Sequence, residues 1–342
     1  QEHKLTHISH QAAFGSVPKS INNPLLWNQV NVQGTLNILW AAKENNIKKV
    51  ASSDVIWFNG GNQNFHVDSL VENDGSPSPL LQEVYKVYDN GAIVGGTSAG
   101  TAIMCNPMIG AGKSLGALLD GVTDEDNYSD PEDNRVFLRN GFDFFQEGIV
   151  DQHFIKRGRL GRLVRAAYFT ESNFGIGVDE NTAALIDGDS IEVYGENGVL
   201  VFNFREMVIK KDSHFKKIKL HYLTQGDKLD IVSGKYETNP AKDLSLVGNE
   251  YYAGNQLNSN VFGIDAVSNM LTEGLLDNTE TKAQGIAFRM ISDSKAEGVK
   301  LIFKETENSE GYFGKVDGEN TYTVYNILLE IVPIKMSIES NL

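Results

Sequence analysis

The stretch "AIVGGTSAGTAIM" at residues 92–104 constrains the fold more than any other part of the sequence. An apolar run typical of a buried strand leads into small residues around Ser98, and a second apolar run follows. The pattern Gly-x-Ser-x-Gly at residues 96–100 predicts a tight strand-to-helix turn. Either this turn is tight for packing reasons and the serine has no chemical role, or Ser98 is a nucleophile at its apex. The second interpretation requires a base, an acid and an anion-binding group elsewhere in the chain.

The surrounding pattern predicts an α/β fold. Apolar runs alternate with helical stretches between residue 54 and about residue 190, which predicts a mostly parallel sheet covered on both faces. In such sheets ligands bind at the carboxyl ends of the strands. The expected strands are "DVIWFNGG", "AIVGG", "GIVDQHF" and "FGIGVDENTAALI", and the expected helices are "LLQEVYKVYDNG" and one starting at "TAIMCNPM" that Pro107 disturbs.

The texture changes after residue 190 to β-rich segments such as "SIEVYG" and "VLVFNF", followed by a tail that suggests a small β appendage. We therefore expect a catalytic core over residues 54–235. Residues 236–342 are expected to form a β-rich C-terminal extension, in which the sequence indicates no chemistry.

Composition excludes some classes of partner. The formal net charge of -15 argues against binding to nucleic acid or to anionic lipid, since both are polyanions. Cys105 is the single cysteine, so no intramolecular disulfide forms, and we expect it to be a small buried hydrophobic residue. No run approaches the roughly 18 apolar residues of a membrane span. The opening "QEHKLTHISH" is not a signal peptide, so we expect a cytoplasmic location, with secretion as the alternative for a chain whose leader has been removed.

The first part of the chain follows a different pattern. Residues 5–53, with "NVQGTLNILW" and "KKVASS", resemble the middle of an extended short-chain dehydrogenase of the nucleotide-sugar epimerase type. That family needs a Gly-rich turn and a Tyr-x-x-x-Lys pair, which the sequence lacks in the expected context, so we reject epimerase activity. We predict that residues 1–53 supply a strand-helix-strand piece that completes the sheet.

His153 is the strongest candidate for the base that Ser98 requires. In "IVDQHFIKRGRLGRL" it follows an apolar strand, at the edge of the sheet where Ser98 is expected. The alternative is a histidine at a strand end that is bonded to a neighbour. We prefer that alternative for His66, His214 and His221.

Four motifs in order, "FNGGNQ", "GGTSAG", "DQHFIKRGRLGRL" and "GIGVDENTAALI", give the chain a specific resemblance. Residues 51–235 resemble the cyanophycinase branch of a serine peptidase family and, more distantly, its aspartyl dipeptidase branch. The resemblance implies a three-layer α/β sandwich with a mostly parallel sheet, similar to class I glutamine amidotransferases, and a nucleophile elbow.

The same resemblance implies a catalytic triad. Ser98 corresponds to the nucleophile, His153 to its general base and Glu180 in "GVDENTA" to the acid. The dipeptidase branch takes its acid from the segment between serine and histidine, which makes Asp120 the alternative. Asp124, Glu125 and Asp126 lie in that same segment.

An oxyanion hole is expected from the backbone N–H of Ala99 together with that of Gly60 or Gly61. Gln63 is expected to reach the substrate. The family usually has aspartate where this chain has Asn62, so no role is assigned to that side chain.

The residues around His153 suggest a substrate-binding cluster. Three arginines near a catalytic histidine can clamp substrate carboxylates, or they can form a solvated face of the following helix; in an acidic protein we prefer the clamp. Asp151 and Gln152 are candidates for binding cationic or amide groups. The cluster therefore comprises Asp151, Gln152, Arg157, Arg159 and Arg162.

The resemblance implies a serine exopeptidase that cleaves cyanophycin, a polyaspartate whose side chains carry arginine, to β-Asp-Arg dipeptides, and the residues around His153 fit this substrate. An aspartyl or isoaspartyl dipeptidase is the first alternative, and a noncatalytic binding protein on a peptidase scaffold is the second. No metal or organic cofactor is expected, because serine, histidine and carboxylate suffice for acyl transfer. A homodimer is expected from the family resemblance alone.

Overall fold

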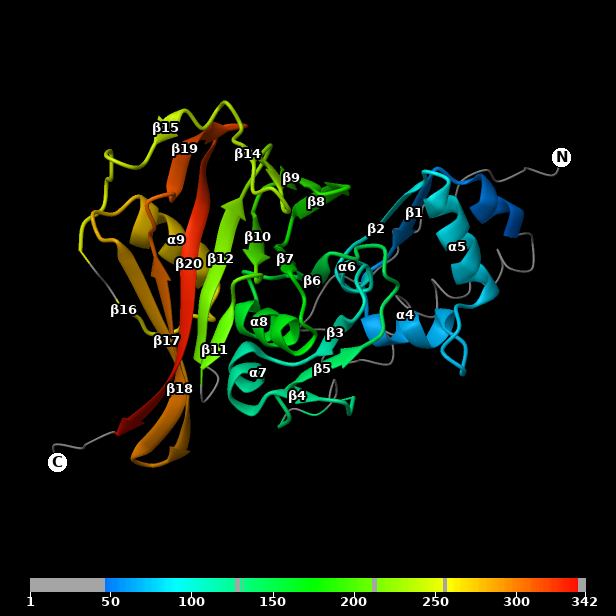
Figure 1. Cartoon of the computed structure of the whole chain (residues 1–342), viewed down its shortest axis with the longest axis horizontal. Coiled ribbons are helices and arrows are strands. Elements are labelled where there is room, and N and C mark those ends of the chain that lie inside the picture. Colours follow the sequence, from blue (N-terminus) through cyan, green and yellow to red (C-terminus); the bar gives the residue numbers. More distant parts are fainter. Residues whose placement is uncertain (1–46, 127–129, 131, 211–213, 255–256, 338–342) are drawn as a thin grey trace. The chain divides into compact units, whose positions relative to one another are not determined.

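The computed structural model describes residues 47–337 except 127–129, 131, 211–213 and 255–256 (Figure 1). The chain divides into two compact units. Unit 1 ends at Cys105 and also includes residues 140–144, whereas unit 2 comprises residues 106–139 and 145–342. Most of the predicted strand-helix-strand piece at 1–53 lies outside the described residues. The predicted domain limits at residues 53 and 235 stay predictions.

Unit 1 is built on a pair of parallel strands. β1 and β2 pair in register from Val55 with Ile93 to Phe58 with Gly96. Two helices, α4 and α5, lie in the segment that joins them. The periodicity of "LLQEVYKVYDNG" predicts α5, and Ser78 caps this helix by accepting from the N–H of Leu81. The elements of unit 1 are η2 (Ile47–Ser52), β1 (Val55–Phe58), α4 (Gln63–Leu70), α5 (Pro79–Asp89), β2 (Ile93–Gly96) and α6 (Ala99–Ala102).

The predicted helix beginning at "TAIMCNPM" is much shorter than expected. α6 ends at Ala102, and the chain then passes through Cys105 and Pro107 into strand β3. Pro107 cannot donate a helical hydrogen bond and would stop a longer helix at this residue, but α6 ends before it is reached. Cys105 is fully buried, as predicted.

Unit 2 contains one large sheet with smaller sheets beside it. Among the described residues, eleven strands form the large sheet, whose main path is β16-β17-β18-β20-β12-β10-β7-β6. Figure 1 shows the long strand β20 between β18 and β12. The core around the large sheet consists of aliphatic and aromatic side chains, with Val199, Leu200 and Phe202 of β10 fully buried.

The elements of unit 2 up to the end of β11 are β3 (Met108–Ala111), α7 (Ser114–Asp120), β4 (Val122–Thr123), β5 (Val136–Arg139), β6 (Gly148–Gln152), α8 (Leu160–Phe169), β7 (Phe174–Val178), β8 (Thr182–Asp187), β9 (Ser190–Gly195), β10 (Val199–Asn203) and β11 (Val208–Lys210). The remaining elements are β12 (His214–Leu223), β13 (Lys228–Asp230), β14 (Tyr236–Glu237), β15 (Leu244–Ser245), β16 (Leu257–Asn258), α9 (Ala266–Leu271), η4 (Thr272–Leu276), β17 (Lys282–Ser292), β18 (Lys295–Lys304), β19 (Glu310–Val316) and β20 (Glu319–Ser337).

The expected mostly parallel sheet is wrong for the eleven-stranded sheet. β6 and β7 are parallel, but β7, β10, β12, β20, β18 and β17 pair antiparallel in succession. The short turn between β17 and β18 cannot join parallel neighbours, which need a long crossover. The large sheet also crosses residue 235, because β12 pairs with β20. The prediction of a β-rich C-terminal region is confirmed.

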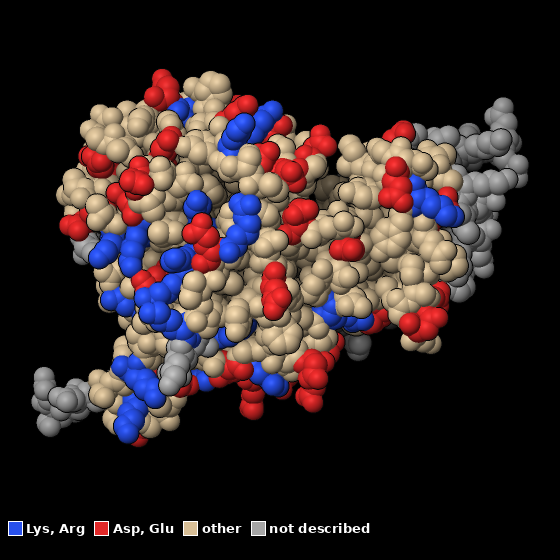
Figure 2. Space-filling model, viewed as in Figure 1, with Lys and Arg blue, Asp and Glu red and all other residues tan. Residues whose placement is uncertain are grey.

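Surface charge differs between parts of the molecule. On the face shown in Figure 2, Asp and Glu are spread widely, whereas Lys and Arg gather mainly over the β-rich part of unit 2. The described residues contain no helix long and apolar enough to cross a membrane.

Candidate active site

Ser98 occupies a strained turn between β2 and α6. Its backbone has φ 56° and ψ -112°, in a region that residues with a Cβ seldom adopt. Such a conformation costs on the order of 1–3 kcal/mol and persists only when its surroundings hold it. The turn therefore needs tight packing on both sides of the serine.

The two glycines of the Gly-x-Ser-x-Gly pattern provide that packing. A Cβ on Gly96 would lie 2.5 Å from the carbonyl carbon of Gly100, and one on Gly100 would lie 2.1 Å from the carbonyl oxygen of Phe58. Thr97 donates its N–H to that Phe58 oxygen over 3.0 Å, and the Thr101 hydroxyl donates to the Gly96 carbonyl over 2.8 Å. Close backbone contact between β1, β2 and α6 explains why small residues surround Ser98.

The loop after β1 lies against Ser98. A Cβ built on Gly60 would be 3.3 Å from Cβ of Ser98 and 3.8 Å from its Oγ, and Gly61 has φ 145°. Gly60, one of the expected oxyanion donors, therefore lies close to Ser98, and Ala99, the other, follows the serine as the first residue of α6. Gln63 is buried in the first turn of α4.

Asn62 has a structural role that the sequence did not reveal. Its side chain caps α4 by accepting the N–H of Asn64 over 2.9 Å. Asparagine and aspartate cap helices equally well, so the departure from the family's usual aspartate leaves this turn intact.

His153 and Glu180 form a close pair in unit 2. They follow the carboxyl ends of the parallel strands β6 and β7, and Nδ1 of His153 lies 2.7 Å from Oε1 of Glu180. When Nδ1 donates to that carboxylate, Nε2 is the acceptor nitrogen of the neutral ring. His153 also has a left-handed backbone, with φ 48°.

The electrostatic surroundings keep His153 neutral. Burial lowers the pKa of His153 below its ordinary value of 6.5, and the charges of Arg157 and Arg159 lower it further, against the opposing effect of Glu180. A histidine with a lowered pKa is unprotonated at neutral pH, which is the state that a general base requires.

Asp179 fixes the loop that carries His153, and sequence reasoning missed it. Its Oδ1 accepts the backbone N–H groups of Ile155 and Lys156 at 3.2 and 3.1 Å. The Phe154 ring packs against Gly177, where any Cβ would overlap the ring. The sequence could have indicated this role, because Asp179 directly precedes the predicted acid Glu180 in "GVDENTA".

Asp151 and Arg162 are a buried ion pair. The guanidinium donates to both carboxylate oxygens at 2.7 and 2.6 Å, and also to the Gly112 carbonyl at 2.9 Å. Burial acts to raise the pKa of Asp151, but Arg162 and Arg159 outweigh it and hold the pKa below its ordinary range.

This pairing corrects two expectations. Asp151 is 0% exposed and Arg162 is 4% exposed, so neither side chain presents its charge to a substrate. The carboxylate of Asp151 on β6 and the guanidinium of Arg162 on α8 pair with each other in the protein interior. Oδ1 of Asp151 also accepts the backbone N–H of Gln152, the residue before His153, over 2.9 Å.

Arg157 and Arg159 differ from Arg162 in exposure. The Arg157 side chain is about one-third exposed, with Nε 4.0 Å from Oε1 of Glu180. Arg159 donates from Nη1 to the carbonyl oxygen of Gln152 over 2.6 Å. The Oε1 atom of Gln152 is buried and has no hydrogen-bond partner among the residues that the structure describes.

Asp120, the alternative acid, is engaged elsewhere. It ends α7 and accepts two hydrogen bonds from the Arg289 guanidinium, each 2.6 Å long. The carboxylate that contacts His153 in unit 2 is that of Glu180.

The expected site residues thus fall into two groups, each assembled within its own unit. Unit 1 holds the nucleophile candidate and its expected oxyanion and amide neighbours, namely Ser98, Ala99, Gly60, Gly61 and Gln63. Unit 2 holds the candidate base, acids and charged residues, namely Asp120, Asp151, Gln152, His153, Arg157, Arg159, Arg162 and Glu180.

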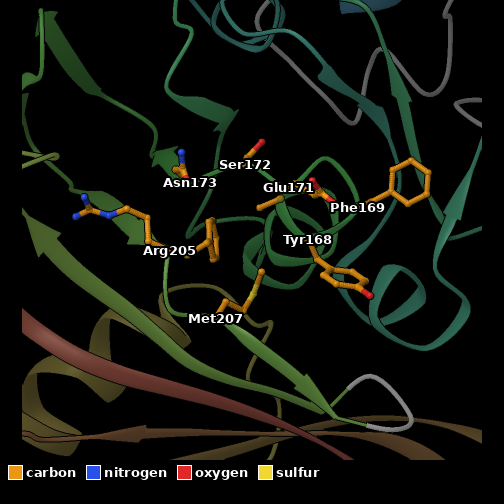
Figure 3. A pocket seen from close by; sticks show the side chains of 9 residues that line it. Tyr168, Phe169, Glu171, Ser172, Asn173, Arg205 and Met207 are labelled. Carbon is orange, nitrogen blue, oxygen red and sulfur yellow. The ribbon is translucent and has the colours of Figure 1, made fainter.

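A cavity of about 410 Å³ in unit 2 lies away from the His153–Glu180 pair. The end of α8 and the turn before β7 line it, together with Phe204, Arg205 and Met207 (Figure 3). It is at the amino end of β7, whereas Glu180 follows the carboxyl end. No group of three or more metal-ligating side chains occurs in the described part of the chain.

Comparison with known proteins places these motifs in a family context. Residues 34–194 match the model of peptidase family S51, and residues 1–54 match a family described as polysaccharide biosynthesis protein. The predicted resemblance to the cyanophycinase family is thereby confirmed, and a match to a different family covers the N-terminal segment.

Curated relatives agree with the family match. Proteins named cyanophycinase are 28% identical over 197 residues in Synechococcus elongatus, 30% over 166 in Trichormus variabilis and 30% over 161 in Geminocystis herdmanii. These alignments cover 55%, 46% and 44% of this chain and 56%, 51% and 54% of the relatives. The chain spans about half the length of the curated relatives that it matches.

Proposed function

We propose, from the match of residues 34–194 to peptidase family S51, that this chain is a serine-type peptidase that hydrolyses cyanophycin. Ser98 is the nucleophile, His153 the general base and Glu180 the residue that orients the imidazole. The 2.7 Å contact between His153 and Glu180 carries the proposal. A Gly-x-Ser-x-Gly turn alone also occurs for packing reasons, whereas a histidine oriented by a carboxylate is what a serine nucleophile needs.

In the proposed reaction, His153 accepts the proton of the Ser98 hydroxyl as Oγ attacks the scissile carbonyl carbon. The backbone N–H of Ala99 and that of Gly60 or Gly61 stabilise the oxyanion. His153 then returns the proton to the departing amine, and water hydrolyses the acyl-enzyme by the reverse sequence. The turn at Ser98 belongs to a nucleophile elbow within a three-layer sandwich.

Cyanophycin is proposed as substrate because the relatives carry the name cyanophycinase and the charges near His153 suit it. Arg157 is the best candidate for binding a substrate carboxylate, because its guanidinium is partly exposed beside Glu180. Gln152 offers a buried amide oxygen that can accept from an amide or guanidinium donor. The net charge of -15 attracts a polymer coated with arginine.

A fluorophosphonate probe tests the nucleophile assignment independently of substrate. We expect stoichiometric labelling that maps to Ser98 by peptide mass spectrometry, and loss of labelling in Ser98→Ala. His153→Gln is expected to slow labelling by at least about 10²-fold, the lower end of general-base contributions. Labelling at another serine, or at an unchanged rate without His153, would overturn the assignment.

A substrate panel separates the proposed activity from the dipeptidase alternative. Cyanophycin and short β-aspartyl peptides are incubated with equal amounts of enzyme, and products are followed by mass spectrometry. Release of β-Asp-Arg from the polymer supports the cyanophycinase assignment. Cleavage of the short peptides alone would identify a dipeptidase instead.

A further inference from the structure

The loop that carries His153 has a conformation that needs external support. Both His153, with φ 48°, and Gly158, with φ 55°, are left-handed. A non-glycine residue in this region is strained and persists only where its surroundings over-determine it. What holds residues 153–158 therefore also holds the imidazole.

Part of this support comes from neighbouring elements of the matched region. Asp179 at the end of β7 accepts the N–H groups of Ile155 and Lys156. The Ser114 hydroxyl at the start of α7 donates to the Gly158 carbonyl over 2.5 Å. These contacts fix one side of the loop.

The other side of the loop rests on the C-terminal region. Asp265 accepts two hydrogen bonds from Lys156 Nζ, at 2.6 and 2.8 Å. The carbonyl oxygen of Phe262 lies so close to Gly158 that a Cβ there would be only 2.1 Å away. Two independent contacts thus join the segment 262–265 to the loop.

The backbone of Asp265 is held by hydrogen bonds of its own. Its backbone is left-handed, with φ 57°, and its side chain makes no capping hydrogen bond to α9. Its carbonyl accepts from Asn269 N–H and from the Ser268 hydroxyl. Nearby, Val261 donates to Ile286 of β17, which anchors the segment to the large sheet.

We propose that Asp265, through Lys156, is a positioning residue for His153, so that the C-terminal region takes part in the reaction. The inference rests on the proposed function. It assigns a role to a segment beyond residue 194, where the match to peptidase family S51 ends. Asp265 keeps the loop in the conformation that presents His153 to Glu180, so its loss lowers kcat more than it changes KM.

Substitutions can remove the ion pair without disturbing the backbone. Asp265→Asn keeps the size of the side chain, and asparagine tolerates a left-handed conformation. Lys156→Met removes the partner charge, and Lys156→Arg retains it. Glu192→Gln is the matched control, because it breaks a partly exposed ion pair with Lys228 on a different sheet.

The first readout is hydrogen exchange in the free enzyme, which needs no activity. We expect amides in residues 153–158 to exchange about fivefold faster in Asp265→Asn, corresponding to the upper end for a partly exposed ion pair. Lys156→Met should give the same change, the double variant no more, and Lys156→Arg and Glu192→Gln little or none.

The second readout is kinetic, with cyanophycin as substrate. We expect kcat to fall about fivefold in Asp265→Asn with KM unchanged, and Lys156→Arg to retain most of the activity. Unchanged exchange overturns the inference, as does faster exchange with full kcat. If the wild type is inactive but amide exchange in residues 153–158 is still faster in Asp265→Asn and Lys156→Met, the proposed function is refuted. The conclusion that Asp265 holds the loop would then stand.

Discussion

Replacing Arg162 by methionine tests whether the Asp151–Arg162 pair is structural or part of a substrate clamp. The wild-type pair has two hydrogen bonds of 2.7 and 2.6 Å, and its side chains are only 1% and 5% exposed. Arg162→Met leaves the Asp151 carboxylate buried without this partner. Breaking a buried pair from one side costs about 3–5 kcal/mol. Arg159, whose Nη1 lies 3.6 Å from Oδ1 of Asp151, compensates in part, so we expect about 3 kcal/mol.

The assay is urea denaturation at pH 7, following the transition of unit 2 by circular dichroism. The double variant Asp151→Asn/Arg162→Met removes both charges and should recover much of the loss, since an uncharged pair carries a smaller desolvation cost. Lys228→Met, which breaks an exposed ion pair, should cost less than about 1 kcal/mol.

The pH dependence provides a second check on the same variant. In the wild type the pKa of Asp151 is lowered, so the pair stabilises the fold above the ordinary pKa of the carboxyl and that contribution is lost at acid pH. In Arg162→Met burial should raise this pKa, so the variant's deficit should shrink as pH falls. If Arg162→Met lowers the free energy of unfolding by less than about 1 kcal/mol at pH 7, the buried-pair interpretation is refuted. Binding of a substrate carboxylate by Arg162 would then be the better interpretation.

Three further predictions concern the catalytic groups. Glu180→Gln should lower kcat by about 10²–10⁴-fold, because the imidazole loses its orienting carboxylate, whereas Asp120→Asn should change it less than about threefold; the reverse ranking would make Asp120 the acid. The acid limb of kcat/KM should have its midpoint below pH 6.5, since neutral His153 is required and its pKa is lowered, and Arg157→Gln should move that midpoint upward; a midpoint above 6.5 would contradict the electrostatics. Gly100→Ala should destabilise unit 1 by at least about 1–3 kcal/mol in denaturant titration, because its Cβ would overlap the Phe58 carbonyl, and a neutral effect would contradict the packing at Ser98.

Local patterns were sufficient to locate the parts of the site. The sequence around Ser98 predicted a strand, a tight turn and a helix, and each is present because the glycines allow close backbone contact. Likewise, "GIVDQHF" and "FGIGVDENTAALI" contain the parallel strands β6 and β7, whose shared edge holds His153 beside Glu180.

Long-range pairing could not be predicted in the same way. The antiparallel partnership of β12 with β20 joins residues more than 100 positions apart, and the alternation of each strand fits many partners. Lys156 and Asp265 are separated by 109 positions, so no local spacing indicates their contact. The burial of Arg162 could not be predicted either, because the spacing of the three arginines is compatible both with a solvated helix and with a helix packed against the core.

The central claim is that Ser98 performs serine-peptidase chemistry on cyanophycin. The most direct test incubates the purified chain and Ser98→Ala with cyanophycin and follows β-Asp-Arg release by mass spectrometry. The account predicts release by the wild type and none above background by Ser98→Ala. Equal release by both proteins, or none from a wild-type preparation shown to be folded, would contradict it.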